Sequence, residues 1–230
     1  MQDRKYLLSI QEFLEEGSHG RLWNEAVSKV DAERCARAEQ MTVDRVKASC
    51  LGAGLLLQLA VREAVEGSSN RGFAQFSASM LLERLPGVIP ISYQYGENGK
   101  PYLREYPFYF NLSHSGDYVF CVLSAHEIGA DIQKHGTYDK SRLAERFFAP
   151  QEITALGECG EEREALFYRL WARKEAYGKL TGQGVVSTVG KNVLPGAEYE
   201  EERKPVWEEY GEMEGYSLAI CRYADSVTAV

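Results

Sequence analysis

Two oxygen-bearing side chains in one apolar strand are the first residues that could do chemistry. In Ile128-Gly-Ala-Asp-Ile-Gln133, the alternation of a strand places Gly129, Asp131 and Gln133 on one face. Aspartate is disfavoured inside strands. A hard cation such as Mg²⁺ takes oxygen ligands of this kind, often with substrate phosphates completing its shell. Asp131 and Gln133 are therefore candidate metal ligands. The plain alternative is a hydrogen-bonded aspartate near a strand end.

A second feature is the segment Trp-Ala-Arg-Lys-Glu-Ala-Tyr-Gly-Lys, which ends at Lys179. Trp171, Glu175 and Lys179 recur every four residues, so a helix puts them on one face. A buried Trp171 would leave the Glu175 carboxylate at the border of a core, beside the ammonium groups of Lys174 and Lys179. An amphipathic helix with a surface Glu–Lys pair is the plain alternative.

The third and fourth features lie in predicted hairpins. In Asn111-Leu-Ser-His-Ser-Gly116, Ser113 and His114 are not a catalytic pair, because consecutive strand side chains point to opposite faces. His114 is better suited to bind a phosphate, with Ser113 and backbone N–H groups as further donors. A turn whose serines bond to its own backbone is the alternative. Lys100 follows Gly99 in the other hairpin, where a lysine is usually only solvated.

The order of elements predicts an α+β protein in which each half runs from a strand through helices to strands. Asn98-Gly99 is a strong hairpin signal, and Gly182 is placed to end a long helix. We expect one subdomain over 1–124 and a second over 125–230 that carries the metal and catalytic residues. The expected elements are a strand over 5–10, helices over 22–40 and through 51–65, hairpins over 91–103 and 109–124, a strand over 128–133, helices over 141–148, 151–158 and 162–180, and a last strand YSLAICR.

Composition narrows the class of protein. The chain has 230 residues, 44% of them hydrophobic, and a net charge of −8, which excludes collagen-like and bulk-disordered chains. The acidic balance argues against nucleic-acid binding. No stretch approaches eighteen apolar residues, so no membrane span is expected, and the N-terminus lacks the apolar middle of a signal peptide. Five cysteines without Cys-x-x-Cys spacing favour a reduced, cytoplasmic protein.

Together the four features resemble the Sfp-type 4′-phosphopantetheinyl transferase family. That family carries Gly-Lys-Pro, Phe-Asn-x-Ser-His-Ser, a Val/Ile-Gly-x-Asp strand and a Trp/Phe-x-x-Lys-Glu-Ala/Ser-x-x-Lys helix. The matching segments here, in the same order, are Gly99–Pro101, Phe110–Ser115, Ile128–Asp131 and Trp171–Lys179. A further segment, Arg146-Phe-Phe-x-x-x-Glu152, looks like the family's Arg-Phe-Phe-x-x-x-Glu. The resemblance covers roughly 42–182, and YSLAICR looks like the family's last strand.

The resemblance implies a fold and a reaction. The implied fold is two similar α+β subdomains related by a pseudo-twofold, with coenzyme A bound in the cleft between them. The implied reaction moves 4′-phosphopantetheine from coenzyme A to a serine of an apo acyl or peptidyl carrier protein and releases 3′,5′-ADP. Taken with the composition, it predicts a monomeric cytoplasmic enzyme that uses Mg²⁺ and coenzyme A and has no nucleic-acid or membrane partner.

The resemblance further implies a role for each residue of the site. Asp131 and Glu175 would hold Mg²⁺ against the pyrophosphate, and Glu175 would accept the proton of the carrier serine. Two lysines would stabilise charge on the pyrophosphate and the leaving group, namely Lys174 and Lys179. The residues implied to hold the nucleotide end are Lys100, Ser113 and His114, with Arg45 or Lys47 on the 3′-phosphate.

The sequence departs from the family pattern at one position, and the same residues allow two alternative functions. The family strand often continues Asp-x-Glu, whereas here Gln133 offers a neutral carbonyl oxygen. A degenerate homologue that binds coenzyme A or a carrier without transfer is the first rival. The second is a hydrolase using Ser113 or Ser115 with His114, although the sequence lacks a Gly-x-Ser-x-Gly elbow.

The identity of the carrier stays open among fatty-acid, polyketide and nonribosomal-peptide carriers. Such carriers are generally acidic, so we expect them to dock on a basic rim. The candidate rim residues lie in the arginine-rich region 142–173 and are Arg142, Arg146, Arg169 and Arg173.

Overall fold

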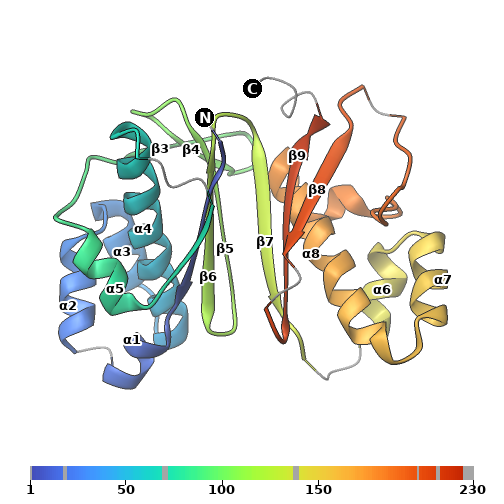
Figure 1. The fold of residues 1–230 in the computed structure, drawn as a ribbon, viewed down its shortest axis with the longest axis horizontal. Helices are drawn as coiled ribbons and strands as arrows, with labels where there is room; N and C mark the ends of the chain where they lie inside the picture. The colour runs from blue at the N-terminus through green and yellow to red at the C-terminus, as the bar shows by residue number, and fades with distance from the viewer. Residues whose placement is uncertain are drawn as a thin grey trace. The chain divides into compact units, whose positions relative to one another are not determined.

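The computed structural model describes residues 2–17, 20–68, 72–136, 140–200, 202–210 and 213–224. The chain divides into two compact units (Figure 1). The N-terminal unit comprises Met1–Tyr95 and Pro101–Ala125, and the C-terminal unit comprises Gly96–Lys100 and His126–Val230. Helices and several sheets are mixed along the chain, which confirms the predicted α+β class.

The N-terminal unit is built on a four-stranded sheet in the order β2-β1-β6-β5. Its strands are β1 (Arg4–Ser9), β2 (Phe73–Phe76), β5 (Tyr109–Ser115) and β6 (Tyr118–Ser124). Only the β1–β2 pair is parallel. The predicted hairpin is confirmed as β3 (Tyr93–Tyr95) and β4 (Pro101–Leu103), with Gly99 at a φ of 79° in its turn.

Five helices, α1 to α5, cover one face of this sheet (Figure 1). They are α1 (Gln11–Glu16), α2 (Arg21–Ser28), α3 (Ala32–Glu39), α4 (Asp44–Val65) and α5 (Ala78–Arg84). The single helix expected over 22–40 is wrong. It divides because the Asp31 carboxylate accepts a hydrogen bond of 2.9 Å from the Arg34 backbone N–H and so caps α3.

Helix α4 is the core of the N-terminal unit. By length and composition its 22 residues could cross a membrane, which corrects the expectation that no stretch comes close. However, 83% of its most apolar window is buried, and the helix packs against β6, β1 and β5. A continuous apolar helix surrounded by protein is typical of a core helix.

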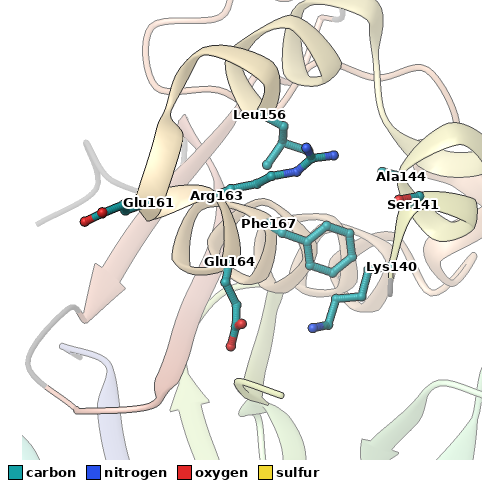
Figure 2. A pocket seen from close by; sticks show the side chains of 8 residues that line it. All are labelled: Lys140, Ser141, Ala144, Leu156, Glu161, Arg163, Glu164 and Phe167. Atoms are coloured by element: carbon teal, nitrogen blue, oxygen red, sulfur yellow. The ribbon is translucent and has the colours of Figure 1, made fainter. Parts of the chain in front are cut away.

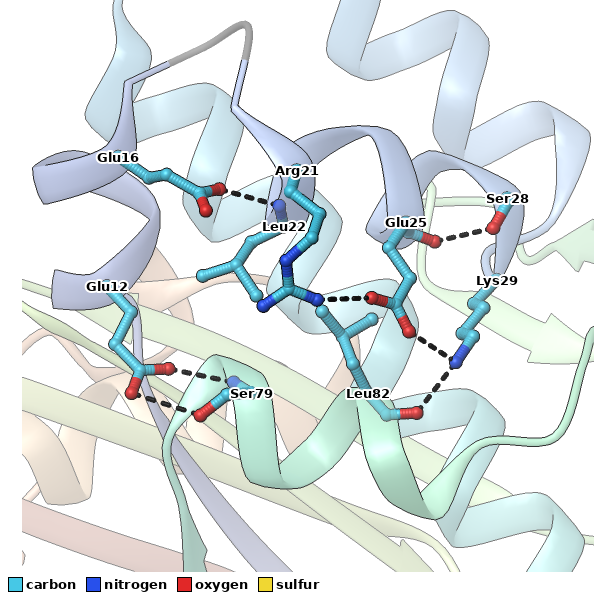
Figure 3. A network of polar contacts seen from close by, with 9 residues as sticks. All are labelled: Glu12, Glu16, Arg21, Leu22, Glu25, Ser28, Lys29, Ser79 and Leu82. Atoms are coloured by element: carbon cyan, nitrogen blue, oxygen red, sulfur yellow. Dashed lines mark hydrogen bonds and ion pairs between the residues drawn. The ribbon is translucent and has the colours of Figure 1, made fainter.

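Two carboxylates of α1 accept hydrogen bonds from the N-termini of α2 and α5 (Figure 3). Glu12 accepts hydrogen bonds from the backbone N–H and the hydroxyl of Ser79 at 2.7 and 3.1 Å, and Glu16 accepts one of 2.6 Å from the Leu22 N–H. Both N–H groups lie in the first turn of a helix, where no intrahelical acceptor exists. These bonds therefore stabilise α5 and α2, and they give this network a structural role.

The C-terminal unit has a three-stranded antiparallel sheet in the order β7-β9-β8. Its strands are β7 (Ile128–Lys134), β8 (Pro205–Tyr210) and β9 (Tyr216–Tyr223). Its helices are α6 (Ser141–Phe147), α7 (Pro150–Glu158) and α8 (Arg163–Thr181), with short 3₁₀ turns at Gly160–Glu162 and Val185–Thr188. Gly182 ends α8 at a φ of 72°, as predicted.

Helix α8 lies directly on this sheet because Gly129 leaves no side chain in the way. A Cβ at Gly129 would lie 1.9 Å from the Ala176 carbonyl oxygen and 2.4 Å from the Leu180 nitrogen. The apolar face of α8, which includes Ala176 and Leu180, packs in one cluster with Ala219 and Cys221 of β9. This close approach brings the polar residues of β7 within reach of α8.

Candidate active site

Asp131 of β7 is the centre of the candidate site. Its side chain is almost fully buried, with 2% of the residue exposed. Its Oδ1 accepts a hydrogen bond of 2.6 Å from Lys179 Nζ on α8, and its Oδ2 accepts one of 2.7 Å from Gln133 Nε2. The second bond confirms that Asp131 and Gln133 share one face of the strand. In this arrangement Gln133 presents its amide N–H to Asp131 and so orients the carboxylate.

Glu175 lies on α8 one turn before Lys179 and is half-buried. No described residue donates a hydrogen bond to its carboxylate or forms an ion pair with it. Burial raises the pKa of Glu175, the negative charge of Asp131 raises it further, and the Lys179 ammonium lowers it. The structure thus brings Asp131, Glu175 and Lys179 together, as predicted, and leaves Glu175 available to accept a proton or a cation.

The donor set of this site fits a hard divalent cation. Asp131 and Glu175 offer carboxylate oxygens, and the side-chain amide of Gln133 lies beside them. Within the described residues no group of three His, Cys, Asp or Glu side chains could hold a metal. Two carboxylates suit Mg²⁺, because this ion keeps several waters and is commonly completed by substrate phosphates.

Lys174 occupies a different environment from Glu175, its neighbour in sequence. It is fully buried and pairs with the equally buried Glu152 at 2.9 Å. Its ammonium also donates to the carbonyl oxygens of Lys191 at 2.5 Å and Thr188 at 3.3 Å. An ammonium has three donors, and these three acceptors use them all. The predicted role of Lys174 on the pyrophosphate is therefore corrected to a structural one.

Glu152 is a structural residue whose pairing with Lys174 the sequence pattern does not predict. One of its oxygens accepts from the Ala149 backbone N–H and the other from that of Val193, each at 2.7 Å. The bond to Ala149 closes the first turn of α7. The sequence contains a signal for the role of Glu152 at the start of α7. A proline at the first position of a helix, followed two residues later by a glutamate, is typical of a helix N-terminus. Glu152 and Lys174 together hold α7, α8 and the segment 188–193 in place.

We expect Lys174→Met to destabilise the protein by about 3–5 kcal/mol, because it leaves the Glu152 carboxylate buried and uncompensated. Adding Glu152→Gln should recover much of that loss, since the double variant buries no charge. Urea denaturation of both variants measures the effect. Unchanged stability of the single variant, with loss of coenzyme A affinity, would restore Lys174 to the substrate site.

Lys100 belongs to the C-terminal unit and lies under the end of α8. Its Nζ donates to the carbonyl oxygens of Leu180 at 2.7 Å and Ile128 at 3.4 Å. Burial lowers the pKa of Lys100 to about 8, while Glu127 opposes that shift. The position complements the negative end of the helix dipole. The predicted contact with the nucleotide stays a prediction, and the bonds of Lys100 to these two carbonyl oxygens give it an anchoring role.

Ser113 and His114 lie on opposite faces of β5, Ser113 buried and His114 exposed. This confirms the predicted alternation of side-chain directions along the strand. Of the two basic candidates, Arg45 pairs with Asp117 and donates at 3.0 Å to the Gly116 carbonyl oxygen in the turn that follows β5. Lys47 instead lies over the ring of Trp23, 5.8 Å from its centre. The geometry therefore favours Arg45 over the predicted Lys47 as the base nearest to the His114 hairpin.

The arginines expected at a docking rim separate into two groups. Arg142 and Arg146 on α6 and Arg169 on α8 are exposed. Arg173 is buried against Trp207 and Glu209, which corrects its assignment to the rim. The three exposed residues remain candidates.

A pocket of about 410 Å³ lies between α6, α7 and the start of α8 (Figure 2). Phe167 lines it together with side chains of both charges, from Lys140, Arg163, Glu161 and Glu164. None of the residues predicted to bind metal or substrate lines it. The pocket is therefore separate from the Asp131–Glu175 site.

Comparison with known proteins finds matches over the part of the chain that carries these residues. The family model described as the 4′-phosphopantetheinyl transferase superfamily matches residues 127–221, which include Asp131, Glu175 and Lys179. The chain is 46% identical to the 4′-phosphopantetheinyl transferase psf-1 of Bacillus pumilus over 90 residues, 38% of each chain. It is 37% identical to the 4′-phosphopantetheinyl transferase Sfp of Bacillus subtilis over 91 residues, 39% of this chain and 40% of that protein.

A longer match decides the family. The 4′-phosphopantetheinyl transferase AcpT of Salmonella typhimurium is 36% identical over 156 residues, which cover 66% of this chain and 80% of that protein. The chain spans less than half the length of several other curated relatives that it matches. The AcpT match, together with the family model over the C-terminal unit, confirms the predicted resemblance: the chain belongs to the 4′-phosphopantetheinyl transferase superfamily.

Proposed function

We propose that this protein transfers 4′-phosphopantetheine from coenzyme A to a serine of an apo acyl or peptidyl carrier protein. The observation that carries the proposal is the meeting of Asp131, Glu175 and Lys179 within the segment matched by the family model. Two carboxylates and one ammonium can bind a metal–pyrophosphate group and accept a proton. Phosphoryl transfer requires this kind of positioning and charge neutralisation more than covalent assistance.

In the proposed reaction the carrier serine Oγ forms a bond to the phosphorus that bears the pantetheine arm. The bond from that phosphorus to the bridging oxygen breaks, and the electron pair leaves with 3′,5′-ADP. The serine proton passes to a Glu175 carboxylate oxygen, directly or through a water. The raised pKa of Glu175 makes it a stronger base than an ordinary carboxylate.

The other residues hold the substrates in this scheme. Asp131 and Glu175 would bind Mg²⁺, with Gln133 orienting Asp131 and offering a neutral oxygen. When bound, Mg²⁺ supplies neutralisation of the pyrophosphate charge. Lys179, whose side chain is 28% exposed, can reach from Asp131 toward the phosphates and stabilise the charge that develops on the leaving group. His114 and Arg45 are the proposed contacts to the nucleotide end.

The family resemblance supports the finer parts of the proposal. We place coenzyme A between two halves related by a pseudo-twofold, and we propose a monomeric cytoplasmic enzyme without nucleic-acid or membrane partners. All five cysteines are free thiols, which suits a reducing compartment.

Release of 3′,5′-ADP tests the reaction. We expect 3′,5′-ADP to accumulate when the protein is incubated with coenzyme A, Mg²⁺ and an apo carrier, and to stop accumulating when the carrier is omitted. Binding of coenzyme A without release would favour the degenerate binding homologue. A matched variant, His114→Ala, should raise the KM for coenzyme A with little change in kcat, because it removes binding that is equal in ground and transition states.

A further inference from the structure

A second pocket of the C-terminal unit lies on the opposite flank of α8 from Glu175. It occupies about 460 Å³ beside β8, whereas Asp131 lies on β7, the other edge of the three-stranded sheet. Arg173, Trp207 and Tyr199 contribute its large side chains. One wall is the turn Leu194-Pro-Gly-Ala197, in which the Ala197 N–H donates to the Leu194 carbonyl oxygen at 3.1 Å and Gly196 has a φ of 80°.

The Arg173 guanidinium in this pocket is buried and poorly paired. Its side chain is 8% exposed, and its only acceptor among the described residues is Glu209, 3.5 Å from Nη1. Neither Nε nor Nη2 has an acceptor in the described part of the chain, and Nε is wholly buried. A guanidinium carries five N–H donors. A buried cation of this kind is costly unless a negative group satisfies it.

Arg173 differs from the two other described arginines whose Nε atom is buried without a hydrogen-bond acceptor. Arg4 donates to the Ser68 carbonyl oxygen at 2.6 Å, and Arg62 donates to that of Gly87 at 2.9 Å. Each of these therefore has a short bond to the backbone. Among the described residues Arg173 has only the long contact to Glu209 as a hydrogen bond. We therefore infer that its remaining N–H groups serve to bind a ligand.

The rest of the lining indicates what that ligand is. The Trp207 ring stacks under Arg173, 4.6 Å from the guanidinium carbon, and the Tyr199 ring lies 5.6 Å from that of Trp207. Leu194, Pro195 and other aliphatic residues complete the wall. Aromatic rings and prolines in the lining favour a ligand with a flat, apolar part. Because Glu209 partly neutralises Arg173, a single negative charge fits the pocket better than a phosphate dianion.

We propose that this pocket binds a small aromatic monocarboxylate, with the carboxylate on Arg173 and the ring against Trp207 and Tyr199. The site is independent of the proposed phosphopantetheine transfer. A planar guanidinium binds a carboxylate through two parallel hydrogen bonds, and the aromatic rings give the flat body its contact area. The ligand joins α8 to β8 and to the turn at 194–197.

Calorimetric titration with phenylacetate tests the proposal, with phenylacetamide as its neutral counterpart and inorganic phosphate as the dianion. We expect saturable binding of phenylacetate that is about tenfold or more tighter than that of phenylacetamide, since a hydrogen bond to a charged group is at stake. Phosphate should bind more weakly than phenylacetate. Equal affinity for the acid and the amide, or no saturable binding of either, would overturn the proposal.

Three variants locate the site. Arg173→Met should abolish the preference for phenylacetate over phenylacetamide. Glu209→Gln should tighten phenylacetate binding severalfold, because it removes the competing carboxylate. Arg169→Met should leave both the preference and the affinity unchanged. Arg169 is the matched control because it lies one turn earlier on α8 and is exposed. If Arg173→Met fails to fold, Glu209→Gln alone decides: unchanged affinity in that variant contradicts the assignment.

Discussion

Glu175→Gln is expected to abolish transfer while raising the melting temperature of the protein. The Glu175 carboxylate is half-buried, no described residue donates to it, and burial and the nearby Asp131 both raise its pKa. Its charge is therefore a cost to the folded state that the proposed reaction requires. A neutral glutamine of the same shape removes that cost and removes the base and metal ligand with it. Differential scanning calorimetry and a turnover assay on one preparation measure both effects.

The gain in stability of Glu175→Gln over the wild type should increase as the pH rises. A carboxyl group whose pKa is higher in the folded state than its ordinary value of 4.5 binds its proton more tightly when folded. Its protonation favours the folded state, so the wild-type protein loses this contribution as the pH rises through the raised pKa. The advantage of Glu175→Gln should be largest at neutral pH and vanish in acid. Glu164→Gln changes an exposed residue of the same helix, so it should alter neither the melting temperature nor the turnover. Near-normal turnover of Glu175→Gln would exclude Glu175 as base and metal ligand.

Gly129→Ala is expected to destabilise the protein by about 3 kcal/mol and to lower activity at the same time. The added methyl group would lie 1.9 Å from the Ala176 carbonyl oxygen, which is backbone and cannot rotate away. Helix α8 must therefore move off β7, which separates Asp131 from Lys179. Urea denaturation gives the stability, and calorimetric titration of Mg²⁺ should report weaker binding.

Gly157→Ala provides the matched control for this substitution. Gly157 lies in α7, and apart from its chain neighbours and its own helix backbone no described atom lies within 4 Å of a Cβ position, so alanine there should stabilise the protein by about 0.5–1 kcal/mol through helix propensity. If both substitutions have the same small effect, α8 does not approach β7 as closely as described.

The candidate site was predictable where side-chain direction follows from local periodicity. Alternation along a strand was enough to put Asp131 and Gln133 on one face, and four-residue spacing was enough to put Glu175 beside Lys179. The hairpin at Gly99 and the end of α8 at Gly182 followed from turn chemistry in the same way.

The errors concern residues whose partners are distant in sequence. Lys174 precedes Glu175, yet its side chain points to Glu152 and to carbonyl oxygens beyond α8, which no local pattern reveals. Arg173 was expected on the surface, but the strand that buries it begins more than thirty residues later, at Pro205. Asp31 divides a predicted helix because capping competes with continuation, and the sequence pattern allows both.

Intact-mass spectrometry of apo carrier proteins tests whether this protein transfers phosphopantetheine. Fatty-acid, polyketide and nonribosomal-peptide carriers would be incubated with coenzyme A, Mg²⁺ and either wild-type protein or Glu175→Gln, with a serine-to-alanine carrier as a blank. We expect at least one carrier to gain the mass of a single phosphopantetheine arm with the wild type, and no gain with the variant or with the blank carrier. If all three carriers stay apo while a known transferase converts them, the assignment of Asp131, Glu175 and Lys179 as a transferase site is contradicted.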